Sequence, residues 1–206
     1  MLKLYYGPRT IAVATLIALE EAGAEYEPVR LDMANLQQRT PEYLAINPKG
    51  RVPALVTDRG ILTETPATLA YIAQTHPDAK LAPFDDPFAF AEVQSFCAYL
   101  CSTVHVAHAH KMRGARWATE ASSFADMRAK VPETMTASAA HLDSHCIAGP
   151  YVLGDRPSLA DAYLFVVASW MPGDGVDVAA FPKLSALLAA MEARDSVKKV
   201  RAEGLL

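Results

Sequence analysis

The sequence predicts two domains, an α/β domain with a small mixed sheet followed by an all-helical domain. In the first 76 residues, short strand-like runs alternate with helix-like runs in the order βα-βα-ββα, which is typical of an α/β layer. The segment from His76 to Pro87 then contains three prolines, a density that favours a linker over a helix. Only helical spacing follows. We therefore place the domains at residues 1–76 and 87–206.

The strands of the first domain are predicted at Leu2–Tyr6, Tyr26–Leu31, Val52–Thr57 and Ile61–Thr63. Pro28 places the second strand at a sheet edge, because proline cannot donate a hydrogen bond to a central ladder. The sequence Asp58-Arg59-Gly60 predicts a hairpin turn between the last two strands. Helices are expected over Thr10–Ala22, closed by Gly23, and from Pro66 to about Gln74.

The second domain is predicted to contain four long helices and a short closing helix near residues 196–202. Apolar residues recur at three- and four-residue spacing in Phe88–Lys111, Ala121–Ile147, Leu159–Met171 and Lys183–Arg194. Ser158 and Asp161 have the spacing of a capping box at the start of the third helix. That helix is strongly apolar, and an unpaired buried donor costs about 1–3 kcal/mol. We therefore interpret Asp161 as structural rather than catalytic.

The composition favours a well-packed chain with neither nucleic acid nor a membrane as partner. Apolar residues make up 51% of the chain, and the net charge of −4 argues against nucleic-acid binding. No uncharged apolar run reaches 18 residues, and the start of the chain breaks too early for a signal peptide. We expect a cytoplasmic protein. The three cysteines lack paired zinc spacing, and His105, His108 and His110 lack a completing ligand, so no metal is expected.

Two segments of the first domain together indicate a site for a small peptide. In Asn47–Leu55, the pair Val52-Pro53 begins a strand. A cis bond between them would turn the chain and expose the backbone of Val52 to an extended ligand, which would pair with it as an added strand. The spacing leaves the isomer open, because only about 5–6% of X–Pro bonds are cis.

The second segment, Leu62–Pro66, predicts an anion site at a helix start. Thr65 precedes Pro66, and proline favours the first helical position, so Thr65 is predicted as the N-cap. The unpaired amides of the first turn and the helix dipole attract a carboxylate. Glu64 is placed to bind an ammonium group beside it. The alternative is a capped helix after a hairpin, with Glu64 solvated.

Four segments occur in the order and spacing of a known family: Lys3–Pro8, Asn47–Leu55, Glu64-Thr65 and Gly154–Ala162. The chain resembles the cytosolic glutathione transferases, most closely the bacterial beta-like branch, and the resemblance covers essentially all 206 residues. The resemblance implies a thioredoxin-like first domain, a helical-bundle second domain, glutathione as co-substrate and a small hydrophobic electrophile as its acceptor. It also implies a homodimer, a role in detoxification and the structural role of Asp161.

On this resemblance, the first domain binds glutathione. Val52 and Pro53 would present the backbone, while Glu64 and Thr65 would hold the amino-acid end of the tripeptide. Arg51 is predicted to hold the glycine carboxylate, with Lys49 as a second candidate. For both cations, the alternative is surface charge beside a turn.

The group that activates the thiol is the open question. Lowering a thiol pKa by about two units from its ordinary value near 8.5 requires about 2.7 kcal/mol, which a hydroxyl donor and a helix start can supply together. Beta-like relatives carry a cysteine where this chain has Ile11, and Gly7 stands where some relatives have serine. We rank Thr10 first, Tyr6 second and backbone amides alone third. The alternatives are a helix cap for Thr10 and core packing for Tyr6.

His105 is the best candidate of the second domain, since it matches a histidine that beta-like relatives place against the ligand. Val106 replaces the lysine common beside it, and a histidine at a domain interface is the alternative.

Two further functions remain open from the sequence. One is a glutathione-dependent reductase or peroxidase, although the missing cysteine argues against disulfide exchange. The other is a non-catalytic glutathione-binding or interaction module.

Overall fold

The computed structural model describes all 206 residues and divides the chain into two compact units. The first unit joins Met1–Val93 to Glu192–Leu206, and the second contains Gln94–Met191. The boundary after Val93 falls within helix α4 (Pro87–Tyr99). No helix combines the length and the apolar character that a bilayer-spanning segment requires.

The first unit is built on a four-stranded mixed sheet with the strand order β2-β1-β3-β4. The strands are β1 (Leu2–Tyr6), β2 (Tyr26–Arg30), β3 (Ala54–Thr57) and β4 (Gly60–Thr63). Strand β1 pairs parallel with β2 and antiparallel with β3, which in turn pairs antiparallel with β4. The edge position that Pro28 predicted for the second strand is confirmed, and so is the hairpin.

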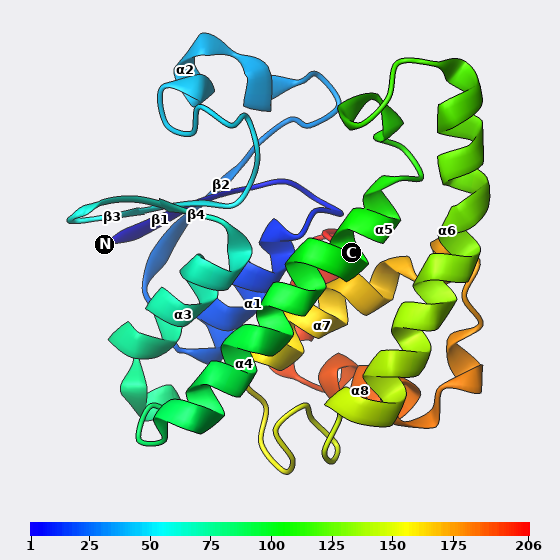
Figure 1. Ribbon diagram of the computed structural model, residues 1–206. Coiled ribbons are helices and arrows are strands. Elements are labelled where there is room, and N and C mark those ends of the chain that lie inside the picture. Colours follow the sequence, from blue (N-terminus) through cyan, green and yellow to red (C-terminus); the bar gives the residue numbers. More distant parts are fainter. The chain divides into compact units, whose positions relative to one another are not determined.

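Helices cover both faces of this sheet. Figure 1 shows α1 (Ala12–Glu21) and α3 (Thr65–Thr75) on one face and the short α2 (Pro41–Leu44) on the other. Helix α1 is buried from Ala12 to Leu19 because it packs against α3 as well as α9 (Asp195–Ala202). The sequence analysis missed α2, whose four residues are too few for a recognisable period.

The second unit contains helices only. They are the remainder of α4, a π-helical segment Leu100–Val104, α5 (His105–Ala109), α6 (Ala121–His141), a π-helical segment Leu142–Cys146, α7 (Leu159–Trp170) and α8 (Pro182–Glu192). Short 3-10 turns complete the chain at Gln37–Arg39, Pro77–Ala79, Gly114–Arg116, Pro172–Asp174 and Val178–Ala180. The predicted helix over Phe88–Lys111 is therefore divided, because its central turn adopts the wider π geometry.

The capping box at the start of α7 is confirmed. The Ser158 hydroxyl accepts a hydrogen bond from the Ala160 amide, and the Asp161 carboxylate accepts one from the Ser158 amide at 2.7 Å. The same carboxylate also accepts hydrogen bonds from the Ser158 hydroxyl at 2.8 Å and from the Val152 amide at 2.7 Å. Asp161 thus ties the preceding loop to a helix that is buried through its first ten residues.

The N-cap predicted for α3 was wrong by one residue. Thr65 is the first helical residue, and Glu64 occupies the N-cap position with φ 72° and ψ 123°. The reason is that Pro66 sits at the second helical position, so the helix begins one residue earlier than the proline signal indicates.

Candidate functional site

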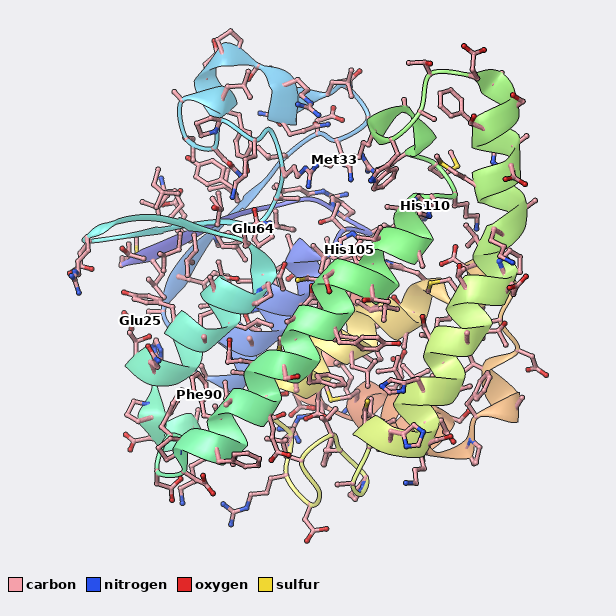
Figure 2. All side chains as sticks on the ribbon, in the orientation of Figure 1. Glu25, Met33, Glu64, Phe90, His105 and His110 are labelled. Carbon is pink, nitrogen blue, oxygen red and sulfur yellow. The ribbon has the colours of Figure 1, made fainter.

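Three separate segments meet at one end of the sheet. Because β1 runs antiparallel to β3, the end of β1 lies beside the start of β3, and the register pairs Tyr5 with Ala54. Because β3 runs antiparallel to β4, the end of β4 lies there too, with Ala54 opposite Thr63. The topology therefore brings the loop after β1, the Val52-Pro53 pair and the start of α3 together. Figure 2 labels Glu64 at this end of the sheet.

The Val52-Pro53 bond is cis. Neither the amide nor the carbonyl of Val52 forms a hydrogen bond within the chain. The preceding carbonyl, that of Arg51, accepts hydrogen bonds from the Tyr43 hydroxyl at 2.6 Å and from the Asn47 side-chain amide at 2.7 Å. Burial raises the pKa of Tyr43 to about 12, so its hydroxyl remains a donor at neutral pH. Tyr43 and Asn47 thus hold the Arg51 carbonyl in place, while the Val52 backbone is left available for an added strand.

Asn47 and Tyr43 are supporting residues that the sequence analysis missed. Replacing Asn47 with alanine is expected to lower the free energy of unfolding by about 1–3 kcal/mol, because its side chain is buried and holds the Arg51 carbonyl. We also expect glutathione binding to weaken, as measured by calorimetry. Tyr43→Phe is the matched control, since it removes the other donor to the same carbonyl and keeps the ring. An equal effect of both variants would contradict a special role for Asn47.

The start of α3 offers unpaired donors next to a carboxylate. Within the chain, the amides of Thr65 and Ala67 have no acceptor, as expected for the first turn of a helix. Glu64 holds a positive φ, which is uncommon for a residue with a β-carbon and occurs most often at functional sites. Its carboxylate forms an ion pair with the Lys49 ammonium, which also donates to the Thr63 hydroxyl at 2.7 Å. Lys49 therefore occupies the position of an ammonium partner of Glu64.

The loop between β1 and α1 forms the third part of the site. The Thr10 hydroxyl donates to the Gly7 carbonyl at 2.7 Å, and the Thr10 carbonyl accepts from the Val13 amide. Helix α1 begins at Ala12 without a side-chain cap, and the amides of residues 10–12 have no acceptor within the chain. This helix start therefore offers three unpaired amide donors and one rotatable hydroxyl to a bound anion.

Comparisons with known proteins match both parts of the chain. Residues 1–74 match the family described as "Glutathione S-transferase, N-terminal domain". Residues 124–201 match the family described as "Glutathione S-transferase, C-terminal domain". Glutathione S-transferase GST-4.5 of Xanthomonas campestris pv. campestris is 32% identical, and the alignment covers 99% of this chain and 100% of that protein.

The chain belongs to the glutathione S-transferase family.

Solved structures agree with this membership. A glutathione transferase homolog from Sulfitobacter with bound glutathione is 56% identical with a TM-score of 0.96, covering 100% of this chain and 99% of the other. A sphingomonad glutathione S-transferase complexed with glutathione is 34% identical with a TM-score of 0.85, covering 99% and 100%. The family and the fold class expected from the sequence, a thioredoxin-like domain plus a helical domain, are confirmed.

A side chain at position 7 would meet Met33. A β-carbon built on Gly7 would lie 2.5 Å from Cγ and 2.9 Å from Sδ of Met33. A side chain added at position 7 would therefore require Met33, labelled in Figure 2, to move. The loop is left with Thr10 as its only hydroxyl side chain.

Tyr6 lies on the other face of the sheet from Tyr5. Strand alternation separates the two rings, and Tyr5 packs with Tyr43 and Val52 in one cluster. Tyr6 is buried, and burial raises the pKa of its hydroxyl, with the Glu203 carboxylate adding to the effect. This placement ranks Thr10 ahead of Tyr6 as a thiol donor, and the role of either residue stays a prediction.

His105 belongs to an aromatic cluster of the second unit. Its ring lies 5.0 Å from that of Trp170, on which His108 stacks at 4.4 Å. The His108 ring contacts the fully buried carboxylate of Asp174 at 2.6 Å, and Lys111 approaches the same carboxylate at 3.2 Å. His105 and His108 therefore both lie against Trp170. The catalytic role of His105 stays a prediction.

Proposed function

We propose that this chain is a glutathione transferase that joins glutathione, through its sulfur atom, to a small hydrophobic electrophile. The observation that carries the proposal is the convergence of three unpaired features at one end of the sheet. These are the free backbone of Val52, the helix start behind Glu64 and the donor-rich start of α1. Family membership supports the same reading.

Each part of the tripeptide has a chemical counterpart in the first unit. The cysteinyl backbone of glutathione pairs with the amide and carbonyl of Val52, which Pro53 turns outward. The α-carboxylate of the γ-glutamyl group lies against the unpaired amide of Thr65, and its ammonium lies against Glu64. Arg51, exposed beside this segment, holds the glycine carboxylate. Lys49 remains a second candidate, although it must first leave Glu64 to take that role.

The chemistry requires only that the thiol be ionised and placed. The thiol loses its proton to solvent, and the thiolate attacks an electrophilic carbon. A new carbon–sulfur bond forms, while a leaving group such as chloride departs with the electron pair of its bond. Stabilisation of the thiolate comes from the start of α1 and from the Thr10 hydroxyl. This hydroxyl exchanges the Gly7 carbonyl for the anion because hydrogen bonds to ionised acceptors are roughly twice as strong.

Replacing Thr10 with valine is expected to raise the pKa of the enzyme-bound thiol by about one unit, since one donor to the anion is lost. The pKa is measured from thiolate absorbance during titration of the complex. Thr10→Ser is the control that keeps the hydroxyl and should retain the lower pKa. An unchanged pKa in the valine variant would assign thiolate stabilisation to the backbone amides of residues 10–12.

Two assays test the proposed function against its alternatives. We expect the protein to be retained on immobilised glutathione and to conjugate glutathione to a chlorinated nitroaromatic. Binding without turnover would favour a binding or interaction module. Reduction of a hydroperoxide or mixed disulfide without conjugation would favour a reductase or peroxidase. Failure to bind glutathione would refute the transferase, the reductase or peroxidase, and the glutathione-binding module alike.

We further propose that the protein acts as a homodimer in the cytoplasm and that His105 contributes to the site. The family resemblance supports the dimer, which light scattering of the purified protein tests directly.

His105→Ala should lower turnover without weakening retention on glutathione. If His105→Ala also abolished retention on immobilised glutathione, the loss of turnover would reflect weaker glutathione binding and not a role of His105 in the reaction.

A further inference from the structure

The segment that follows α9 closes in a well-defined turn, here called the Val200–Leu205 turn. The Leu205 amide donates to the Val200 carbonyl, and the Gly204 amide donates to the Arg201 carbonyl, both at 3.0 Å. Gly204 adopts a left-handed φ of 65°, and the side chains of Val200 and Leu205 are both buried. These are the two hydrogen bonds and the left-handed glycine of a Schellman motif, with both of its apolar positions buried. The turn therefore fixes the direction of the Leu205 carbonyl.

That carbonyl contacts the loop that precedes α1. The Arg9 amide donates a hydrogen bond to it at 2.8 Å. Arg9 has a φ of 55°, a left-handed conformation that is unfavourable for a residue with a β-carbon. The hydrogen bond thus holds Arg9, next to Thr10, in a conformation that the loop would not adopt by preference. Burial, and after it the carboxylate of Glu203 in the same turn, raises the pKa of Tyr6 at the end of β1.

Helix α9, which carries the turn, is anchored to α1. Arg194, just before α9, donates to Glu21 at 2.6 Å, and the Ser196 hydroxyl contacts the same carboxylate. Lys199 donates to Glu20 at 2.7 Å. The loop is consequently held between three fixed elements: the end of β1, the start of α1 and the Leu205 carbonyl.

We propose that the Val200–Leu205 turn is a positioning element for the thiol-activating loop and sets how strongly that loop stabilises the glutathione thiolate. This inference rests on the proposed function. The turn forms no backbone hydrogen bond with Val52 or Glu64, which are the proposed binding groups. It therefore affects the ionisation of the bound thiol and leaves the affinity for glutathione almost unchanged.

The test compares Gly204→Val and Leu205→Ala with the wild-type protein. Valine at 204 opposes the left-handed φ without removing apolar burial, and alanine at 205 removes the buried anchor but keeps the backbone. Both variants are expected to raise the pKa of bound glutathione by about one unit, measured by thiolate absorbance. Conjugation should fall several-fold at pH 6.5 and much less at pH 8.5, where the thiol ionises without help. The dissociation constant should change less than about twofold.

Leu187→Ala is the control for general destabilisation, since it removes the same atoms from a fully buried position in α8 of the second unit. It should leave the thiol pKa unchanged. Adding Arg9→Gly to Leu205→Ala should restore much of the lost activity, because glycine adopts the left-handed conformation without a steric penalty.

An unchanged thiol pKa in both turn variants, or an activity loss equal at both pH values, would overturn the proposal. Failure of the wild-type protein to bind glutathione would instead refute the proposed function, so the two failures are distinguishable.

Discussion

Replacing Asp161 with alanine is expected to lower the free energy of unfolding by about 3–5 kcal/mol, the largest effect on stability that we predict. The carboxylate is fully buried and accepts hydrogen bonds from the amides of Val152 and Ser158 and from the Ser158 hydroxyl. Alanine leaves these donors without an acceptor at a site that water does not reach. Denaturant unfolding followed by circular dichroism measures the loss.

Ser158→Ala is the matched control for Asp161. It removes the hydroxyl cap but leaves both amide donors paired with the carboxylate, so it should cost about 1 kcal/mol. If the two variants were equally destabilised, the cap itself rather than the buried carboxylate would be the important element.

The contribution of Asp161 should also depend on pH. Burial raises the pKa of Asp161 to about 6, although the hydrogen bonds from Val152 and Ser158 oppose this effect. Between the ordinary pKa near 3.8 and this value, the native protein binds the proton that the unfolded chain releases. The stabilisation from this proton is complete below about pH 4 and is lost as the pH rises through 6. The stability difference between wild type and Asp161→Ala should therefore grow on acidification from pH 7, by up to about 3 kcal/mol.

Replacing Glu64 with glutamine is expected to weaken glutathione binding by about 10- to 100-fold. A hydrogen bond between a carboxylate and an ammonium group contributes about 1.5–3 kcal/mol, and glutamine keeps the shape but not the charge. Isothermal titration calorimetry of glutathione and of an analogue lacking the α-amino group measures the effect. The analogue should bind wild type and variant with nearly equal affinity.

Lys49→Met separates the ligand contact from the internal ion pair. It removes the same pair as Glu64→Gln but leaves the carboxylate in place. Because both side chains are substantially exposed, losing the pair itself should change affinity by less than about fivefold. A loss as large as that of Glu64→Gln would show that Lys49 binds glutathione directly. This result is expected if Lys49, the second candidate, holds the glycine carboxylate.

The fold follows from local patterns that are visible in the sequence. Alternating apolar residues predict β1, Pro28 predicts the sheet edge, and Ser158 with Asp161 predicts the cap of α7. Each of these signals lies within a few residues of the element it describes, so no knowledge of distant contacts is needed.

The finer structure of the site depends on distant or irregular contacts. No local pattern indicates that Lys49 pairs with Glu64, that Asn47 holds the Arg51 carbonyl or that Leu205 contacts Arg9. Such contacts depend on where loops come together after the sheet has formed. The group that donates to the thiol could not be predicted either, since no sequence pattern indicates the direction in which a single hydroxyl such as that of Thr10 points.

The packing of Met33 against Gly7 has a consequence for anyone who wishes to re-engineer the chemistry of this protein. Installing a serine at position 7 would require the flexible Met33 side chain to move. A serine at position 7 paired with a smaller residue at position 33 should therefore be tolerated better than the serine alone.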